Sequence, residues 1–132
     1  MLTEVRIATR KKNDWIQITA EVRDAVRASG IAEGLCVVFC PHTTAGIAIN
    51  GNADPDVVRD LVAAMDRASP DHPGFRHAEG NSAAHVKALA TGSSVTLPVA
   101  GGQPVLGTWQ GIWFCEYDGP RQRTLRIKVM RG

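Results

Sequence analysis

Three of the four histidines stand beside other residues that can do chemistry. His42 opens the stretch "HTTAG", His77 opens "HAEGN", and His85 follows within a helical pattern. Imidazole suits divalent transition metals, and three protein ligands leave one position open, as in working metal sites. The sequence therefore indicates His42, His77 and His85 as metal ligands, provided that the fold brings them together, with Glu79 nearby as an acid–base group. His72 lies between Asp71 and Pro73 and is interpreted as a solvated loop residue.

Two predicted helix starts offer free backbone N–H groups to an anion. Asp54 is a capping carboxylate followed by a proline, and the segment 80–82 begins a second helix. The positive end of a helix binds anions readily, and Thr43 and Thr44 add hydroxyls. We therefore expect a phosphorylated ligand, with a metal bridging it. Asp54 has a structural role as a cap in either case, and Asn52 flanks a glycine turn.

A second dense segment is "LGTWQGIWFCEYDGPR". Trp109 and Trp113 are four residues apart and share a face of a strand if no bulge intervenes, with core or interface packing as the default. The glycines on either side of Trp109 indicate a bulge or a close backbone approach. The candidate pocket-edge residues are Gln110, Glu116 and Arg121. Arg121 either binds a phosphate or carboxylate or pairs with Glu116, and both interpretations remain open.

Apolar periodicity predicts about eight short strands and three helices that position these residues. The strands are expected at residues 3–10, 14–19, 34–40, 45–50, 93–99, 105–106, 111–117 and 123–130. The helices are expected at residues 19–29, 55–68 and 82–89, with Thr19, Asp54 and either Asn81 or Ser82 as caps. The connections are mostly too short for parallel crossovers, which favours an α+β domain on antiparallel sheet.

Several packing details follow from the same patterns. The first two strands are close enough to form a hairpin, and strands 34–40 and 45–50 can pair across residues 41–44. The continuous apolar run "GLCVVFC" predicts a strand buried on both faces. The buried stripe of the second helix is expected to comprise Val57, Val58, Leu61, Val62 and Met65.

Length and composition describe a single domain over residues 1–132. The net charge is +2 with 21% charged residues, near the average, which argues against a nucleic-acid partner. No apolar run is long enough to span a membrane, and the N-terminus lacks the apolar centre of a signal peptide. Cys36 and Cys40 lie in an apolar run and are interpreted as buried thiols in the reducing cytoplasm.

Four blocks together resemble the YjbQ family of small proteins, some of which are secondary thiamine-phosphate synthases. The blocks are "HTTAGIAINGNADPDVVRDL", "HAEGNSAAHVKA", "GSSVTLPV" and "LGTWQGIWFCEYDGPRQR". They cover roughly residues 36–130 in the family's order. Thr44 departs from the serine of many members but keeps the hydroxyl.

The resemblance implies an α+β fold with a mostly antiparallel β-sandwich-like or barrel-like sheet, and a homotrimer with its pocket near the subunit boundary. It also implies that a pyrimidine diphosphate is joined to a thiazole phosphate with release of pyrophosphate. The leaving pyrophosphate needs a cation and N–H donors. Histidine ligands favour zinc or another transition metal, and magnesium would enter with a diphosphate substrate.

The site residues that the resemblance implies fall into two groups. The catalytic group is His42, His77, Glu79 and His85, of which the histidines are also the metal ligands. The group that binds substrate or phosphate is Thr43, Thr44, Asn52, Asp54, Gly80, Asn81, Trp109, Gln110 and Arg121.

Two other classes of function remain open. One is a metal-dependent hydrolase of a phosphorylated small molecule, with Glu79 as the general base. The other is a non-catalytic protein that binds a small anion or metal. Pyrophosphate release with a new carbon–nitrogen bond separates transfer from hydrolysis, and turnover of any substrate excludes the non-catalytic class.

Overall fold

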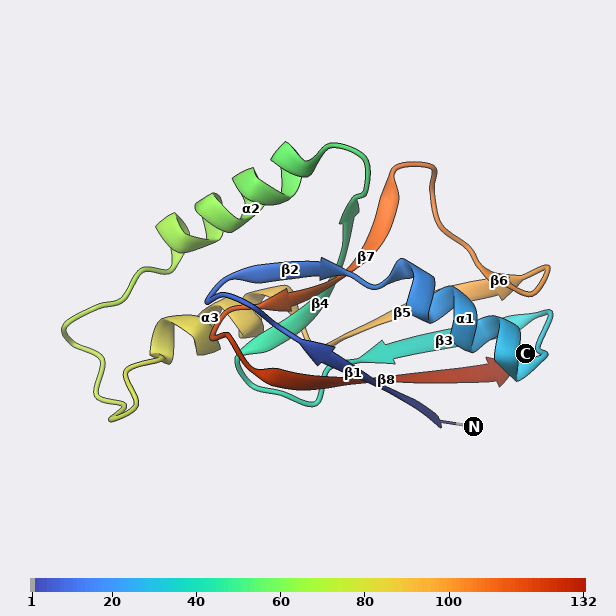
Figure 1. Cartoon of the computed structure of the whole chain (residues 1–132), viewed down its shortest axis with the longest axis horizontal. Coiled ribbons are helices and arrows are strands. Elements are labelled where there is room, and N and C mark those ends of the chain that lie inside the picture. The colour runs from blue at the N-terminus through green and yellow to red at the C-terminus, as the bar shows by residue number, and fades with distance from the viewer. Residues whose placement is uncertain (1) are drawn as a thin grey trace.

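The chain folds into two antiparallel sheets and three helices, as the computed structural model of residues 2–132 shows (Figure 1). The larger sheet has the strand order β1-β8-β3-β5-β6, and the smaller has the order β2-β7-β4. The strands are β1 (Leu2–Ala8), β2 (Asp14–Gln17), β3 (Gly34–Phe39), β4 (Ala45–Gly51), β5 (Ser94–Ala100), β6 (Gln103–Pro104), β7 (Gln110–Glu116) and β8 (Gln122–Arg131). The helices are α1 (Thr19–Ser29), α2 (Pro55–Ala68) and α3 (Ser82–Thr91). The prediction of an α+β fold on antiparallel sheet with three helices is confirmed.

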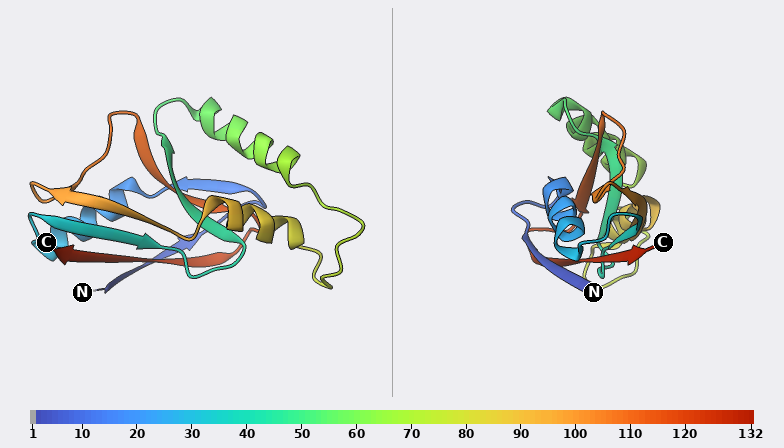
Figure 2. Two further views of the ribbon diagram at one scale, coloured as in Figure 1. Left: turned by 180° about the vertical axis from the view of Figure 1, so that it is seen from behind. Right: turned by 90° about the vertical axis from the view of Figure 1, so that its right-hand side faces the viewer.

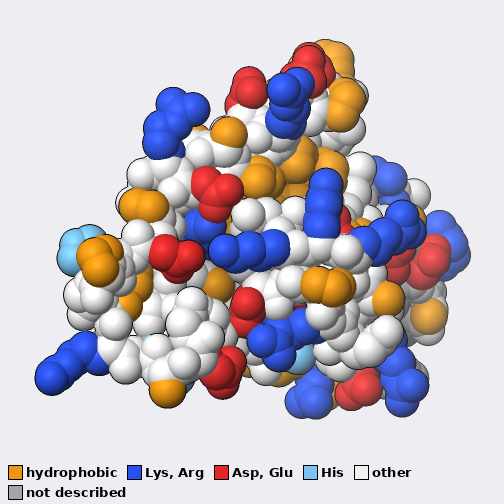
Figure 3. Space-filling view, turned by 60° about the vertical axis from the view of Figure 1, so that its left-hand side comes forward, with side chains coloured by type: hydrophobic (Ala, Val, Ile, Leu, Met, Phe, Trp, Pro, Cys, Tyr) orange, Lys and Arg blue, Asp and Glu red, His pale blue; other side chains and the backbone are white. Residues whose placement is uncertain are grey.

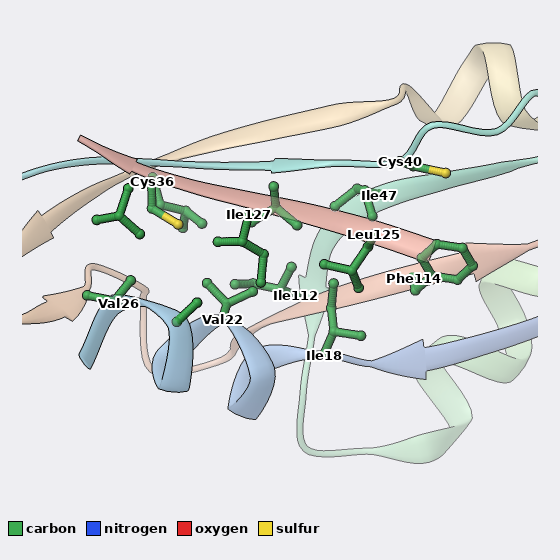
Figure 4. Packing of buried hydrophobic residues seen from close by; sticks show 14 of the residues in the cluster. Ile18, Val22, Val26, Cys36, Cys40, Ile47, Ile112, Phe114, Leu125 and Ile127 are labelled. Atoms are coloured by element: carbon green, nitrogen blue, oxygen red, sulfur yellow. The ribbon is translucent and has the colours of Figure 1, made fainter. Parts of the chain in front are cut away.

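The main core lies between the two sheets and α1. Val22 and Val26 of α1 face Ile127 of β8 and Ile112 of β7, and all four are fully buried (Figure 4). Each such aliphatic side chain contributes about 1.5–3 kcal/mol when buried. A smaller cluster, built on Ala84, Ala88, Cys115 and Tyr117, packs α3 onto the other side of the smaller sheet. Together these clusters hold α3 in place against β4 and β7.

Both predicted strand pairings between sequence neighbours are wrong. β1 pairs with β8 and β2 with β7, while β3 pairs with β5 and β8 and β4 pairs with β7. Residues 9–13 and 40–44 therefore carry the chain from one sheet to the other, as does the turn at 117–121. A short connection shows only that two strands are close, and here they are close across the junction of the sheets.

β3 is buried on one face only, contrary to the prediction from its apolar run. Cys36 and Val38 are fully buried, but Leu35 and Phe39 are 45% and 41% exposed. The reason is that no helix among the described residues covers the outer face of the larger sheet (Figure 2). All three cysteines are buried free thiols, and Figure 4 shows two of them on the strand and at its end, as predicted.

α2 carries an apolar stripe that the rest of the chain covers only in part: Val58, Leu61, Val62 and Met65 are partly buried. The predicted cap is confirmed, because Asp56 N donates to Asp54 Oδ1 over 2.9 Å. The predicted burial of the stripe is wrong: no residue of α2 is buried, and Val57 is 38% exposed. The helix extends away from the sheets in Figures 1 and 2, and hydrophobic side chains gather in a hollow in the upper part of Figure 3, the height at which α2 lies. An ion pair from Lys87 of α3 to Asp66 ties α2 to the body.

Three local predictions need smaller corrections. Thr19 is the first residue of α1 rather than its cap, and its hydroxyl accepts from Ile112 N over 2.9 Å. The short strand after the glycine turn is Gln103–Pro104, two residues earlier than expected. Asn81 is the cap residue of α3 without a capping side-chain bond, and α3 continues to Thr91 before Gly92 ends it.

No helix within residues 2–132 combines the length and apolar character needed to cross a membrane.

Candidate functional site

The three singled-out histidines line one pocket of about 480 Å³ at the junction of the two sheets. His42 comes from the crossing between β3 and β4, His77 from the segment before α3, and His85 from α3 itself. The remaining lining residues are Pro41, Thr43, Thr44, Glu79, Asn81, Arg121 and Arg123. Segments far apart in the sequence thus supply imidazole, hydroxyl, carboxylate and guanidinium groups to one cavity.

The three crossing segments 9–13, 40–44 and 117–121 are hydrogen-bonded to one another. Thr9 N donates to Arg121 O over 2.9 Å, Gly119 N to Lys12 O over 3.1 Å, and Tyr117 N to Thr44 O over 3.1 Å. The backbone that carries the pocket residues is therefore held from several sides.

The ring of His42 is fixed against the start of β8. Its Nε2 lies 3.0 Å from the amide nitrogen and 3.1 Å from the carbonyl oxygen of Thr124. If His42 Nε2 accepts from the Thr124 amide, Nδ1 carries the proton and is a donor. If Nε2 instead donates to the Thr124 carbonyl, Nδ1 has a lone pair and is an acceptor. Burial, and then the positive charge of Arg123, lower the pKa of His42 below its ordinary 6.5. At neutral pH, His42 therefore offers a neutral imidazole.

His77 and His85 form a close pair across the pocket. Their ring centroids are 5.8 Å apart and the rings are nearly perpendicular. His77 is exposed, whereas His85 is partly buried on α3. Gly80, with φ of 75°, makes the turn between them, and its amide donates to His77 O over 3.1 Å. Gly80 thus shapes the segment that presents His77.

The donor types in the pocket suit a transition metal, but their positions do not form a metal site. Among the described residues, no three His, Cys, Asp or Glu side chains lie where they could hold a metal ion together. The imidazoles of His42, His77 and His85 are the right ligands chemically. The predicted metal stays a prediction.

A buried ion pair lies at the inner end of the pocket. Glu116 is fully buried and Arg123 is 6% exposed. Arg123 Nε donates to Glu116 Oε1 over 2.7 Å, Nη2 donates to Oε2, and Nη2 also donates to Thr44 Oγ1 over 2.7 Å. Thr9 Oγ1 and the amide of Asp118 complete the bonds to the carboxylate, over 2.8 and 3.0 Å. The partner of Glu116 is Arg123, so the alternative that paired it with Arg121 is wrong.

Glu116 stays ionised although it is buried. Burial alone would raise the pKa of its carboxyl, but the hydrogen bonds from Arg123, the Asp118 amide and Thr9 outweigh burial and lower the pKa. The pair therefore keeps both charges, and the guanidinium is held rigidly.

Arg121 is engaged by a different carboxylate. Its Nε donates to Asp118 O and its Nη2 to Asp118 Oδ2, both over 2.8 Å. Asn81 Nδ2 donates to the same Asp118 Oδ2 over 2.8 Å and to Glu79 Oε2 over 3.2 Å. Burial would raise the pKa of Asp118, but the bonds from Asn81 and Arg121 lower it. The Asn81 nitrogen faces two carboxylates, so its Oδ1 is a buried acceptor, with no partner among the described residues.

Four predicted site residues lie away from this pocket within the chain. Asn52, Asp54, Trp109 and Gln110 are at the far end of β4 and β7. β4 has seven residues, so this end is roughly 20 Å from the pocket at about 3.3 Å per residue.

These far-end residues build a defined turn. Asn52 Nδ2 donates to Thr108 O and Gln110 O over 3.2 and 3.1 Å, and Gly107 N donates to Gln110 Oε1 over 2.7 Å. A Cβ on Gly111 would lie 2.7 Å from Gln17 Nε2, which is the close approach expected beside Trp109. Trp109 precedes β7 and is 71% exposed, whereas Trp113 is partly buried in the strand. The turn thus presents an exposed tryptophan.

Sequence reasoning missed Arg123, although a signal for it exists. Basic residues recur from Arg121 to Arg131, and this pattern predicts that they lie mostly on the outer face of a strand. Arg123 shares its position in the alternation with Leu125, Ile127 and Val129, all of which point into the core. An arginine on the inward side of an alternating strand indicates a buried charge that needs a partner.

Comparison with known proteins agrees with this fold and these blocks. The chain belongs to the YjbQ-like UPF0047 family, whose sequence model matches residues 3–132. It is 50% identical over 131 residues to the UPF0047 protein YugU of Bacillus subtilis, which covers 98% of this chain and 99% of that one. A UPF0047 protein of Methanocaldococcus jannaschii is 43% identical over 130 residues, covering 98% and 94%.

Solved structures of relatives share the whole architecture. A YjbQ/UPF0047 family protein from Clostridium acetobutylicum, an ortholog of YugU, superposes with a TM-score of 0.95 at 48% identity, covering 97% of this chain and 99% of that one. A protein of unknown function from Sulfolobus solfataricus reaches the same TM-score at 28% identity, covering 100% and 97%. The family and the fold expected from the sequence are therefore confirmed.

Proposed function

We propose that this protein is an enzyme that acts on a phosphorylated small molecule bound in the histidine pocket. The observation that supports this most is Arg123, a buried guanidinium fixed by Glu116 and bonded to the hydroxyl of Thr44 at the pocket wall. A cation held in place before the ligand arrives can stabilise negative charge without rearranging. The reaction to test first is the one that the family resemblance implies, thiamine-phosphate synthase-like joining of a pyrimidine diphosphate to a thiazole phosphate.

The pocket residues have complementary roles in such a transfer. When the carbon–oxygen bond to the leaving pyrophosphate breaks, negative charge grows on its oxygens, and Arg123 and the hydroxyls of Thr43 and Thr44 stabilise it. His77 and His85 lie close enough together to exchange protons with substrate groups in the same cavity. Glu79, exposed and bonded to Asn81, serves as the acid–base group.

Incubation with both substrates is expected to give thiamine phosphate and pyrophosphate in equal amounts. The reaction is followed by chromatography of the heterocycles and by a coupled pyrophosphate assay, with zinc, with magnesium and with a chelator. Release of phosphate or pyrophosphate without the new carbon–nitrogen bond would identify a hydrolase instead. Absence of turnover of any phosphorylated substrate would leave a binding protein.

Hydrolysis is the second candidate, favoured by the His77–His85 pair beside Glu79. These groups lie at the open side of the pocket, where His77 and Glu79 are exposed and water has access. A carboxylate at this place can act as the general base for water.

The cofactor and the cellular location belong to the same proposal. A divalent ion, zinc or another transition metal, or magnesium brought by a diphosphate, would require the pocket histidines to move closer together around it than they lie here. The three buried free thiols support a cytoplasmic location.

We propose further that the protein is a homotrimer. The partly covered stripe of α2 and the exposed Leu35 and Phe39 of β3 are two different apolar surfaces on one chain. Joining unlike surfaces of identical chains gives a head-to-tail interface, and three copies close into a ring when each is rotated by a third of a turn from the next.

Sedimentation is expected to give three times the 14.2 kDa mass of the chain. Val62→Asp, which places a charge in the apolar stripe, is expected to shift the mass to that of the monomer. The control is Ala63→Asp, on the opposite face of α2 and exposed. A wild-type mass near 14 kDa, or an equal effect of both variants, would contradict the proposal.

A further inference from the structure

A second hollow, of about 440 Å³, adjoins the histidine pocket. The two share His42, Thr43 and His85, which therefore stand between them. Beyond these three residues the lining changes from polar and charged side chains to mostly small and apolar ones. The second hollow is lined by Ala45, Ala88, Leu89, Gly92 and Ser93, with no charged side chain among these five.

The floor of this apolar hollow is rigid. Ile47 N donates to Gly92 O over 3.0 Å, which joins β4 to the end of α3. A Cβ on Gly46 would lie 2.6 Å from Gly92 O, so the two backbones are packed as closely as glycine allows. Ala45 and Ala88 are both buried, and their small side chains leave the space open. The hollow therefore does not depend on a mobile loop.

Leu89 forms the outer wall of the hollow and is 84% exposed, the largest value among the exposed hydrophobic residues. The rest of the chain buries little of it. Val86, one turn earlier on α3 and 45% exposed, does not line the hollow. A ligand lying in the hollow would remove apolar surface of Leu89 from water, which favours an apolar group there.

We propose that the two hollows form one bipartite substrate site, and that the substrate is a phosphate ester with an aromatic or aliphatic body. This inference rests on the proposed function, which places the phosphate in the histidine pocket beside Arg123. The apolar body then passes between His42 and His85 and lies against Ala88 and Leu89. A substrate with a polar body, such as a sugar phosphate, gains nothing in the second hollow.

The test compares the binding of inorganic phosphate, phenyl phosphate and glucose 6-phosphate to the intact protein by titration calorimetry at constant ionic strength. Phenyl phosphate is expected to bind about tenfold more tightly than inorganic phosphate, from the apolar area removed from water. Glucose 6-phosphate is expected to bind no more tightly than inorganic phosphate. Leu89→Ala is expected to weaken phenyl phosphate roughly three- to tenfold and to leave inorganic phosphate unchanged. Val86→Ala, the matched control on the same helix, should change neither.

The outcomes separate this inference from the function on which it rests. If inorganic phosphate binds but phenyl phosphate binds no better, or if Leu89→Ala weakens both equally, the apolar subsite is wrong and the phosphate pocket stands. If the wild-type protein binds none of the three ligands, the proposed function and this inference fail together.

Discussion

Replacing Glu116 with leucine is expected to lower the free energy of unfolding by about 3–5 kcal/mol, the usual cost of leaving one charge of a buried pair without its partner. In the variant, Arg123 would remain 6% exposed with no carboxylate beside it. The amide of Asp118 would lose its acceptor as well, and the hydroxyl of Thr9 would keep only the carbonyl oxygen of Arg121. Urea unfolding followed by circular dichroism measures the change.

A double-mutant cycle distinguishes the ion pair from simple loss of packing. Arg123→Met alone is expected to be strongly destabilising, because it leaves Glu116 charged and fully buried. The combination with Glu116→Leu is expected to cost less than the sum of the two single changes, since no unpaired charge remains. Additive losses would show that the pair is not coupled as the structure indicates.

The same pair makes stability depend on pH in a defined direction. The folded pKa of Glu116 lies below its ordinary 4.5, so the folded state binds this proton less readily than the unfolded state. The contribution is complete above about pH 4.5 and is lost as the pH falls through the lower folded value. Hydrogen bonds also lower the pKa of Asp66, mainly through Lys87, so part of the acid sensitivity should persist in Glu116→Leu. If the free energy of unfolding of Glu116→Leu fell with pH as steeply as that of the wild type, Glu116 would not be the source of the acid sensitivity.

His77→Ala is expected to reduce turnover by roughly 10²–10⁴-fold, the range typical of a lost acid–base group. Its free energy of unfolding should stay within about 0.5 kcal/mol of wild type, because the side chain is exposed. Turnover and urea unfolding are measured on the same preparation. Turnover measured across pH separates a proton-transfer role from a binding role, because only the first alters the shape of the pH profile.

His72→Ala provides the matched control for this prediction. His72 is an exposed histidine of the same segment, and its Nδ1 accepts from Gly74 N over 2.9 Å, outside the pocket. It should keep wild-type turnover. Equal losses in the two variants, or unfolding of His77→Ala, would show that the histidine acts through the fold of the segment.

The features that the sequence predicted best depend on neighbours in the chain. The cap at Asp54 and the bounds of the helices at 19–29 and 55–68 follow from backbone chemistry within a few residues. Strand partners were predicted less well because hydrogen bonding between distant segments decides them. For example, Trp15 of β2 pairs with Cys115 across the smaller sheet.

The same difference between local and long-range features applies to the residues of the candidate site. His42, His77 and His85 attract attention by residue type and company, and they line one pocket. Arg123 looked like a surface residue because its partner Glu116 lies on another strand of the other sheet. Burial of the α2 stripe was predicted from periodicity alone, which shows that a face is apolar but not which molecule covers it.

The pocket is lined by residues of two segments that cross between the sheets, 40–44 and 117–121. A ligand bound there would contact residues 41–44 of one segment and Arg121 of the other, and would therefore link the two sheets. If one sheet slid against the other, the groups that bind the ligand would move apart. A ligand that binds only the arrangement seen here would therefore oppose that movement. A ligand that binds tightly would therefore also make the arrangement of the two sheets stiffer, because both effects depend on the same equilibrium between this arrangement and one in which the sheets have slid.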